Sequence, residues 1–126
     1  MLKEKIALVL SCIPTTFVAH YVDEWSPYIC ILEKEGRAMC STYWYEDEPL
    51  LIYLSDLSVS ESARKLGLGT QLQKIHEDIA KQIGATTSCL HVGKTTWMHE
   101  WYQRLGYIDQ EDHNEVEGAV WMKKEL

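Results

Sequence analysis

The sequence predicts one α/β domain over residues 1–126, in which helices pack on both faces of a mixed sheet. Three strand-like segments joined by short turns come first, an order typical of an antiparallel meander. The apolar period then changes to three or four residues, and a helix stands between two strands. Such a crossover makes the two strands parallel. With 126 residues and 46% hydrophobic content, the chain can bury its own core.

Charge and composition exclude several classes of protein. Twelve Lys and Arg stand against nineteen Asp and Glu, for a net charge of −7, which is the wrong sign for a non-specific nucleic-acid binder. No apolar run approaches the ~20 residues that span a bilayer, and the N-terminal apolar segment lacks a signal-peptide cleavage pattern. The four cysteines form no CxxC pair. We therefore expect free thiols, no metal site, no membrane partner and a cytoplasmic location.

Helices are expected at the N-terminus. Apolar residues at helical spacing predict a helix over 2–13, and the β-branched residues among them would also tolerate a strand. A second helix is predicted from residue 15 to 25, because Pro14 can restart a helix and Pro27 ends it. Its apolar side consists of Phe17, Val18, Tyr21, Val22 and Trp25.

The remaining elements follow in order. Strands are predicted at 28–33, 37–46 and 50–59. A helix over 68–83 repeats apolar residues every three or four positions, and Gly84 can cap it. A strand at 86–92 and a short helix at 96–105 come next. Two final strands are predicted at 107–109 and 118–123.

A glycine turn joins the third strand to the long helix. It reads Arg64-Lys65-Leu66-Gly67-Leu68-Gly69-Thr70. The first amides of a helix have no internal partner and carry the positive end of its dipole, so they suit a phosphate. Arg64 and Lys65 add positive charge. The turn is neither a Walker loop nor a dinucleotide fingerprint, and a glycine turn with only a geometric role is the alternative.

Two motifs carry a resemblance to a known family. Val59, Arg64, Gly67 and Gly69 fall in register with the acyl-coenzyme A motif of the GCN5-related N-acetyltransferase (GNAT) family. A second motif, Trp101-Tyr102-Gln103-Arg104-Leu105-Gly106-Tyr107, resembles that family's aromatic-Tyr segment. The resemblance covers residues 50–109 and implies a GNAT-like fold with acetyl-CoA as cosubstrate and an amine as acceptor.

The resemblance also implies roles for backbone groups. The backbone groups of Leu57 and Val59 would form hydrogen bonds with the pantetheine arm, which would lie beside them like an added strand. The thioester carbonyl would be polarised near Leu57. The pyrophosphate would be held by the amides of Lys65, Leu66, Gly67, Leu68, Gly69 and Thr70. Thr95 or Thr96 replaces an Asn that often contacts coenzyme A in relatives, and a weaker version of that contact is expected.

Tyr102 matches the family's usual general acid, which protonates the departing thiolate. Its reference pKa of about 10 lies above that of a thiol. The alternative is a packing role on an aromatic helix. Asp56 stands where relatives often carry an acidic residue, and it is the predicted proton acceptor or else a solvated carboxylate. Further candidates are a water chain, Glu46, His91 and His99.

Regular strand alternation predicts which way residues 53–59 face. One face would carry Tyr53, Ser55, Leu57 and Val59, and the other would carry Leu54, Asp56 and Ser58. Asp56 therefore need not share a side with the pantetheine contacts.

The segment Tyr43-Trp44-Tyr45-Glu46-Asp47-Glu48 combines aromatic rings with carboxylates at a turn. It could hold an ammonium group of a small-molecule or peptide acceptor, or it could be core aromatics followed by a solvated turn. The leading function is acetyl transfer to a primary amine. The alternatives are a non-catalytic acyl-CoA-binding or regulatory module and an acetylase of charged transfer RNA, which the net charge disfavours. The N-terminal helices could also form a homodimer face.

Overall fold

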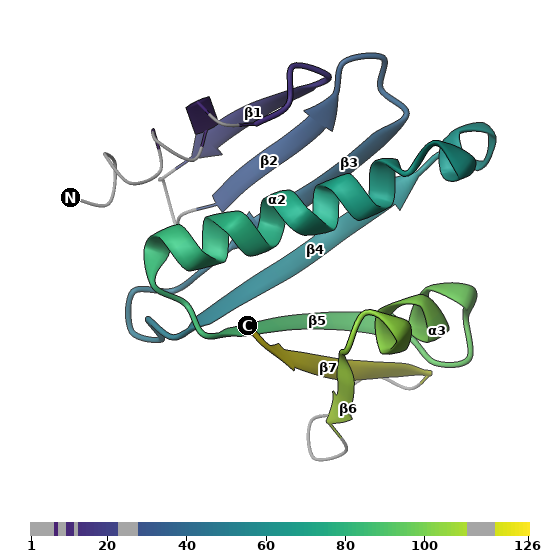
Figure 1. Ribbon diagram of the computed structural model, residues 1–126. Helices are drawn as coiled ribbons and strands as arrows, with labels where there is room; N and C mark the ends of the chain where they lie inside the picture. Colours follow the sequence, from purple (N-terminus) through teal and green to yellow (C-terminus); the bar gives the residue numbers. More distant parts are fainter. Residues whose placement is uncertain (1–6, 8–9, 12, 23–27, 111–117) are drawn as a thin grey trace.

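The computed structural model describes residues 7, 10–11, 13–22, 28–110 and 118–126. Figure 1 shows one twisted sheet with two helices in front of it. No helix among these residues is long and apolar enough to cross a membrane. The helix predicted over 2–13 lies mostly outside the described residues, although Ala7, Leu10 and Ser11 are helical.

The sheet is mixed, as predicted. The described strands lie in the order β1-β2-β3-β4-β5-β7-β6, and every neighbouring pair is antiparallel except the parallel pair β4–β5. The long helix α2 forms the crossover between those two strands. The described elements are β1 (Phe17–Val22), β2 (Tyr28–Glu33), β3 (Ala38–Tyr43), β4 (Leu51–Val59), η1 (Glu61–Leu66), α2 (Leu68–Ile83), β5 (Thr87–Gly93), α3 (Trp97–Arg104), β6 (Ile108–Gln110) and β7 (Ala119–Glu125).

The helix predicted from residue 15 to 25 is wrong where the structure describes it. Phe17–Val22 is strand β1, paired antiparallel with β2 from Phe17↔Glu33 to Val22↔Tyr28. Phe17 is buried, its neighbour Val18 is exposed, and burial then alternates. The same apolar residues fit either period, and hydrogen bonding to β2 selects the strand. Residues 23–25 lie outside the described part of the chain.

Helix α2 packs its apolar side on β3 and β4. Its buried side also carries His76, which is fully enclosed. The two ring nitrogens of His76 form hydrogen bonds to Thr42 Oγ1 of β3 (2.8 Å) and Ser88 Oγ of β5 (2.7 Å). One side chain thus ties the helix to strands on both sides of β4.

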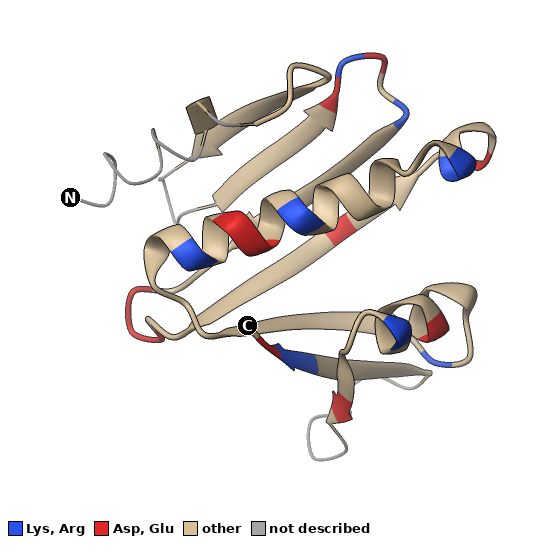
Figure 2. Ribbon diagram, in the orientation of Figure 1, with Lys and Arg blue, Asp and Glu red and all other residues tan. Residues whose placement is uncertain are grey.

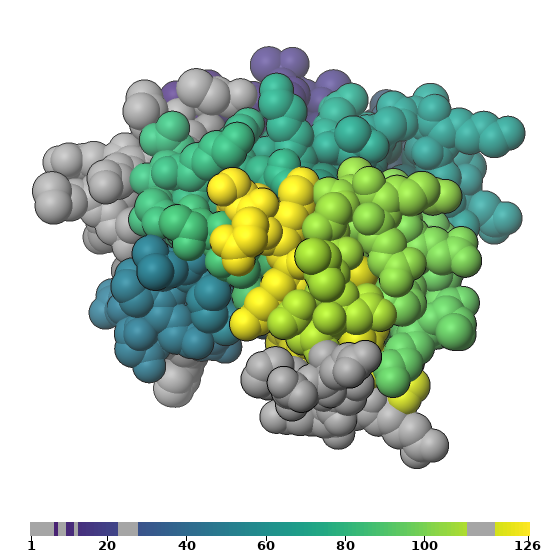
Figure 3. All heavy atoms as spheres, turned by 60° about the horizontal axis from the view of Figure 1, so that its bottom comes forward, coloured from purple at the N-terminus to yellow at the C-terminus, as the bar shows by residue number. Residues whose placement is uncertain are grey.

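Helix α3 lies on the same face of the sheet as α2. The Tyr102 ring of α3 packs 5.5 Å from the ring of Tyr107, whose hydroxyl accepts a hydrogen bond from Gln73 of α2 (2.7 Å). Figure 3 shows α3 and β6 in light green beside the yellow β7. The sequence predicted helices on both faces. The two helices that the structure describes in full share one face, and the predicted 2–13 helix falls mostly outside the described residues.

A β-bulge in β4 changes the facing of its last residues. The register with β3 shifts between Met39 and Ser41, and Asp56 adopts a left-handed backbone with φ 54°. Because of this extra residue, Leu54 and Leu57 both point into the core. The alternation predicted across residues 53–59 is therefore wrong, because the side chains of Leu54 and Leu57 lie on the same face of the sheet.

Strands β4 and β5 also separate at this point. Their pairing runs from Leu51↔Thr87 to Leu54↔Leu90 and then stops, although β4 continues to Val59 and β5 to Gly93. On its other edge β4 still pairs with β3 as far as Val59. The backbone of residues 55–59 is therefore unpaired on the side of β5.

Candidate active site

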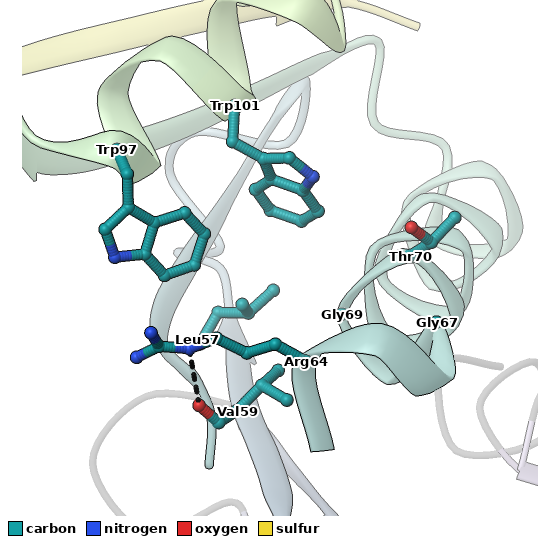
Figure 4. A pocket seen from close by; sticks show the side chains of 8 residues that line it. All are labelled: Leu57, Val59, Arg64, Gly67, Gly69, Thr70, Trp97 and Trp101. Carbon is teal, nitrogen blue, oxygen red and sulfur yellow. Dashed lines mark hydrogen bonds between the residues drawn. The ribbon is translucent and has the colours of Figure 1, made fainter. Parts of the chain in front are cut away.

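A pocket lies where the end of β4, the start of α2 and helix α3 converge. It encloses about 390 Å³ and is open to solvent. Figure 4 shows the side chains that surround it, with the two tryptophans of α3 facing β4 and the glycine turn. The lining residues are Leu57, Val59, Arg64, Gly67, Gly69, Thr70, Trp97 and Trp101.

The glycine turn leaves the start of α2 without a side-chain cap. Gly67 has φ 75°, in the left-handed region, so it ends η1 and opens α2 with no side-chain cap bond. The first helical hydrogen bond runs from the Gln71 amide to the Gly67 carbonyl (3.1 Å). The amides of residues 68–70 precede that bond and have no partner within the helix. With the helix dipole behind them, they form a site for an anion.

Gly69 brings the helix close to the pocket walls. A Cβ at this position would lie 3.5 Å from Val59 Cγ2 and 3.6 Å from the ring of Trp101. Any larger side chain would fill the space between the helix and these walls. The second glycine of the turn therefore leaves space in the pocket that a larger side chain would occupy.

Arg64 supplies positive charge at the mouth of the pocket. Its guanidinium carbon lies 4.9 Å from the centre of the Trp97 ring, and its Nε donates a hydrogen bond to the Val59 carbonyl (3.4 Å). Lys65 is exposed beside it. Figure 2 shows this basic pair on η1, at the end of the sheet away from the acidic β3–β4 turn.

The structure brings together six of the nine residues predicted to bind the coenzyme. The pocket lining includes Leu57, Val59, Arg64, Gly67, Gly69 and Thr70. The side chains of Lys65 and Leu66 are exposed outside that lining, and that of Leu68 is in the core. Sequence reasoning placed Trp97 and Trp101 on α3 without a binding role. Their four-residue spacing, which puts both on one helix face, was the available signal.

Tyr102 does not line this pocket. The side chain is only 4% exposed and packs between the rings of Trp101 (5.0 Å) and Tyr107. Burial raises the pKa of its hydroxyl above the usual value of 10. The group therefore keeps its proton at neutral and moderately alkaline pH.

Asp56 lies on the other face of the sheet and lines a second hollow. This groove beside Asp56 has a volume of about 880 Å³ and is wide open. Thr42 of β3 points toward α2, so its neighbours Ser41 and Tyr43 point away from it, into the groove. The groove is lined by Tyr28, Cys30, Ser41, Tyr43, Tyr45, Ser55 and Asp56. Residues 55–59 of β4 thus contribute to both hollows.

The other predicted candidates have different roles. His99 donates to Asp109 (2.9 Å) while its Nδ1 accepts from the Thr95 amide (3.2 Å). Thr96 caps α3 through a hydrogen bond from the His99 amide (3.2 Å). His91 stacks on Trp121 at 4.8 Å, and Glu46 is exposed. No group of three or more His, Cys, Asp or Glu suited to a metal occurs among the described residues.

Comparisons with solved structures match this fold. The chain is 14% identical to a GNAT family acetyltransferase from Elizabethkingia anophelis with acetyl-CoA bound (TM-score 0.64), covering 90% of this chain and 100% of that one. It is 22% identical to an acetyltransferase from Bacillus cereus (TM-score 0.61; 98% and 87% covered). It is 14% identical to the PaiA N-acetyltransferase of Thermoplasma acidophilum in complex with coenzyme A (TM-score 0.64; 79% and 60% covered).

No curated protein matches the chain by sequence. The family model described as the acetyltransferase (GNAT) domain matches residues 18–109, which is well over half of the chain. Both predicted motifs lie inside that match. The fold, the glycine turn and this match together show that the chain belongs to the GNAT acetyltransferase family.

Proposed function

We propose that this protein transfers an acetyl group from acetyl-CoA to a primary amine. The observation that carries the proposal is the uncapped start of α2, whose amides open into a pocket beside the unpaired edge of β4. Acetyl-CoA supplies the acetyl thioester. Its binding in the solved neighbour from Elizabethkingia anophelis supports the choice, although that likeness concerns the fold.

The residues present fit this cosubstrate. The amides of residues 68–70 and the Arg64 guanidinium would hold the phosphates, because both present positive charge to the same opening. The backbone groups of Leu57 and Val59 face the side on which β4 has no partner strand. They would bind the amide-containing pantetheine arm as a sheet edge binds an added strand. Leu57 follows the bulge, where its amide would polarise the thioester carbonyl.

Two protons must move during the reaction. The amine nitrogen attacks the thioester carbonyl carbon, the C–S bond breaks, and its electron pair goes to sulfur. Tyr102 Oη would donate its proton to that sulfur, since a buried tyrosine with a raised pKa remains protonated where a thiol does not. Asp56, or a water molecule that it orders, would take the proton of the amine from the opposite face.

One observation favours a non-catalytic acyl-CoA-binding module as the second candidate. Tyr102 is 4% exposed and lies outside the pocket lining, so its hydroxyl must become accessible for proton transfer. The two functions differ in one measurement. A binding module binds acetyl-CoA but releases no thiol with any amine, whereas the proposed enzyme does both.

Gly67→Trp is expected to lower the affinity for acetyl-CoA at least ~tenfold. An indole at the start of α2 would cover the amides, and one hydrogen bond to a charged group is worth about 1.5–3 kcal/mol. The matched control is Gly36→Trp in the β2–β3 turn. Gly36 has φ 76° against 75° for Gly67, and a Cβ at either position meets nothing within 4 Å. Both variants therefore carry the same backbone strain, about 1–2 kcal/mol.

The affinity of each variant is measured by calorimetric titration of acetyl-CoA, with folding checked by circular dichroism. Gly36→Trp should bind as the wild-type protein does. Equal affinity in the two folded variants would show that the helix start is not part of the binding site. The proposal would then lose its support.

A further inference from the structure

The groove beside Asp56, called the acceptor-side groove from here on, has the chemistry of a cation site. Its lining combines three tyrosines and two serines with one carboxylate, Asp56, and includes no Lys or Arg. Asp56 is held at its place by the bulge, with its side chain exposed to the groove. A net charge of −7 on the whole chain adds a long-range attraction for cations.

Tyr43 and Tyr45 of the groove lining belong to a tyrosine cluster with Tyr53 of β4, which lies next to the lining and outside it. The rings of Tyr43 and Tyr53 stack at 5.1 Å, and Tyr45 packs edge-on against both, at 5.8 Å and 5.5 Å. The hydroxyl of Tyr53 donates to Glu48 Oε1 (3.2 Å). Tyr43 lines the groove together with Asp56, and burial raises the pKa of its hydroxyl. The tyrosine cluster therefore lies between the carboxylates of Asp56 and Glu48.

The two carboxylates stand at opposite ends of this cluster. Asp56 follows Tyr53 by three residues on β4, and a regular strand at ~3.3 Å per residue sets an upper bound of about 10 Å on this advance, because the bulge shortens it. Glu48 binds at the hydroxyl end of Tyr53, on the side of the β3–β4 turn. Between them lie aromatic rings, which suit methylene groups and ammonium groups alike.

We propose that the acceptor is a linear aliphatic diamine or polyamine that lies along this groove. One primary ammonium would pair with Asp56, beside residues 55–59 that also line the coenzyme pocket. The methylene chain would lie on the tyrosine cluster, and a second ammonium would pair with Glu48. This inference rests on the proposed function, because it names the acceptor for the same transfer site.

The geometry separates this class from bulkier or singly charged amines. A monoamine would use Asp56 and leave Glu48 without a cation. The two anionic ends lie along one strand direction, which fits an extended chain, and the rings between them offer faces and hydroxyl groups but no positive charge. The near ammonium must lose a proton before it attacks, and Asp56 is the described carboxylate at that end of the groove.

The test compares thiol release from acetyl-CoA with n-alkylamines and α,ω-diamines of matched chain length. The kcat/KM for the best diamine should exceed that of its matched monoamine at least ~tenfold, the factor that corresponds to about 1.4 kcal/mol. The advantage should peak at an intermediate chain length, because the second ammonium must reach Glu48.

Two variants locate the effect. Glu48→Gln should bring the ratio of diamine to monoamine kcat/KM close to one. Asp78→Asn is the matched control. It removes the same charge from the exposed side of α2, in the other layer of the molecule, and should retain the wild-type ratio. Acetyl-CoA affinity is measured for each variant so that a coenzyme defect is not mistaken for an acceptor defect.

The possible failures are distinguishable. If acetyl-CoA does not bind, or no amine releases thiol, the proposed enzyme function fails. If acetyl-CoA turns over but monoamines, amino sugars or lysine peptides equal or exceed every diamine, this inference is overturned while the function stands. An unchanged ratio in Glu48→Gln would also overturn it.

Discussion

Replacing Tyr102 with Phe is expected to lower kcat by a factor of roughly 10²–10⁴, the usual contribution of a general acid, which is the role proposed for this residue. The substitution removes one hydroxyl and keeps a ring that packs against Trp101 and Tyr107. The affinity for acetyl-CoA should therefore stay within about twofold of the wild-type value. Because burial raises the pKa of Tyr102, loss of its proton should not reduce the wild-type kcat below about pH 10.

Tyr107→Phe is the control for this experiment. Tyr107 is also buried on the same face, but its hydroxyl is bonded to Gln73 and Ser88. Its loss should reduce stability and leave kcat near the wild-type value. Steady-state rates and urea unfolding of both variants separate the two effects. A Tyr102→Phe enzyme with full kcat would show that the thiolate takes its proton from another group.

The second large effect is a loss of stability in mild acid caused by His76. Burial lowers the pKa of this ring from 6.5 to about 3 in the folded protein. Between these values the unfolded chain binds a proton that the folded chain does not, so the free energy of unfolding falls as the pH falls. The loss is about 2 kcal/mol between pH 6.5 and 5, and about 4 kcal/mol by pH 3. The total free energy of unfolding of a typical domain is only about 5–15 kcal/mol.

Urea unfolding of His76→Gln at pH 6.5 and 5 tests this account. The glutamine can still hydrogen-bond Thr42 and Ser88, but it does not titrate. The His76→Gln variant is expected to be less stable than the wild-type protein at neutral pH. Its free energy of unfolding should fall much less between pH 6.5 and 5 than that of the wild-type protein. His91→Gln, at an exposed site, should keep the wild-type decline. An equal decline in both variants would assign the acid sensitivity to other groups.

Most of the sheet and both described α-helices were predictable because their patterns are local. The strand 28–33 and the helix 68–83 have the predicted bounds, since period and turn residues agree there. Strand β1 was missed because Phe17–Val22 fits both periods, and only pairing with β2 decides between them. Pairing partners distant in sequence leave no local signal.

The candidate site was predictable where it depends on a motif. The motif singled out Val59, Arg64, Gly67 and Gly69 because two glycines and a basic residue at a helix start have a direct physical meaning, and the structure brings these four residues together in one pocket. Their role in binding the coenzyme stays a prediction. The bulge at Asp56 was not predictable, because a left-handed non-glycine residue in a strand is imposed by tertiary contacts. This single extra residue turns Leu57 toward the candidate active-site pocket and leaves Asp56 in the groove on the opposite face.

The most direct test of the central claim is thermal unfolding with and without acetyl-CoA. A ligand at a hundred times its dissociation constant adds about 2.7 kcal/mol to the stability of the folded state. For a domain of this size, the midpoint should rise by roughly 8–15 °C. A rise of this order would establish binding at the start of α2, provided that Gly36→Trp retains it and Gly67→Trp does not. An unchanged midpoint at ~1 mM acetyl-CoA, the upper end of usual enzyme affinities, would contradict the account.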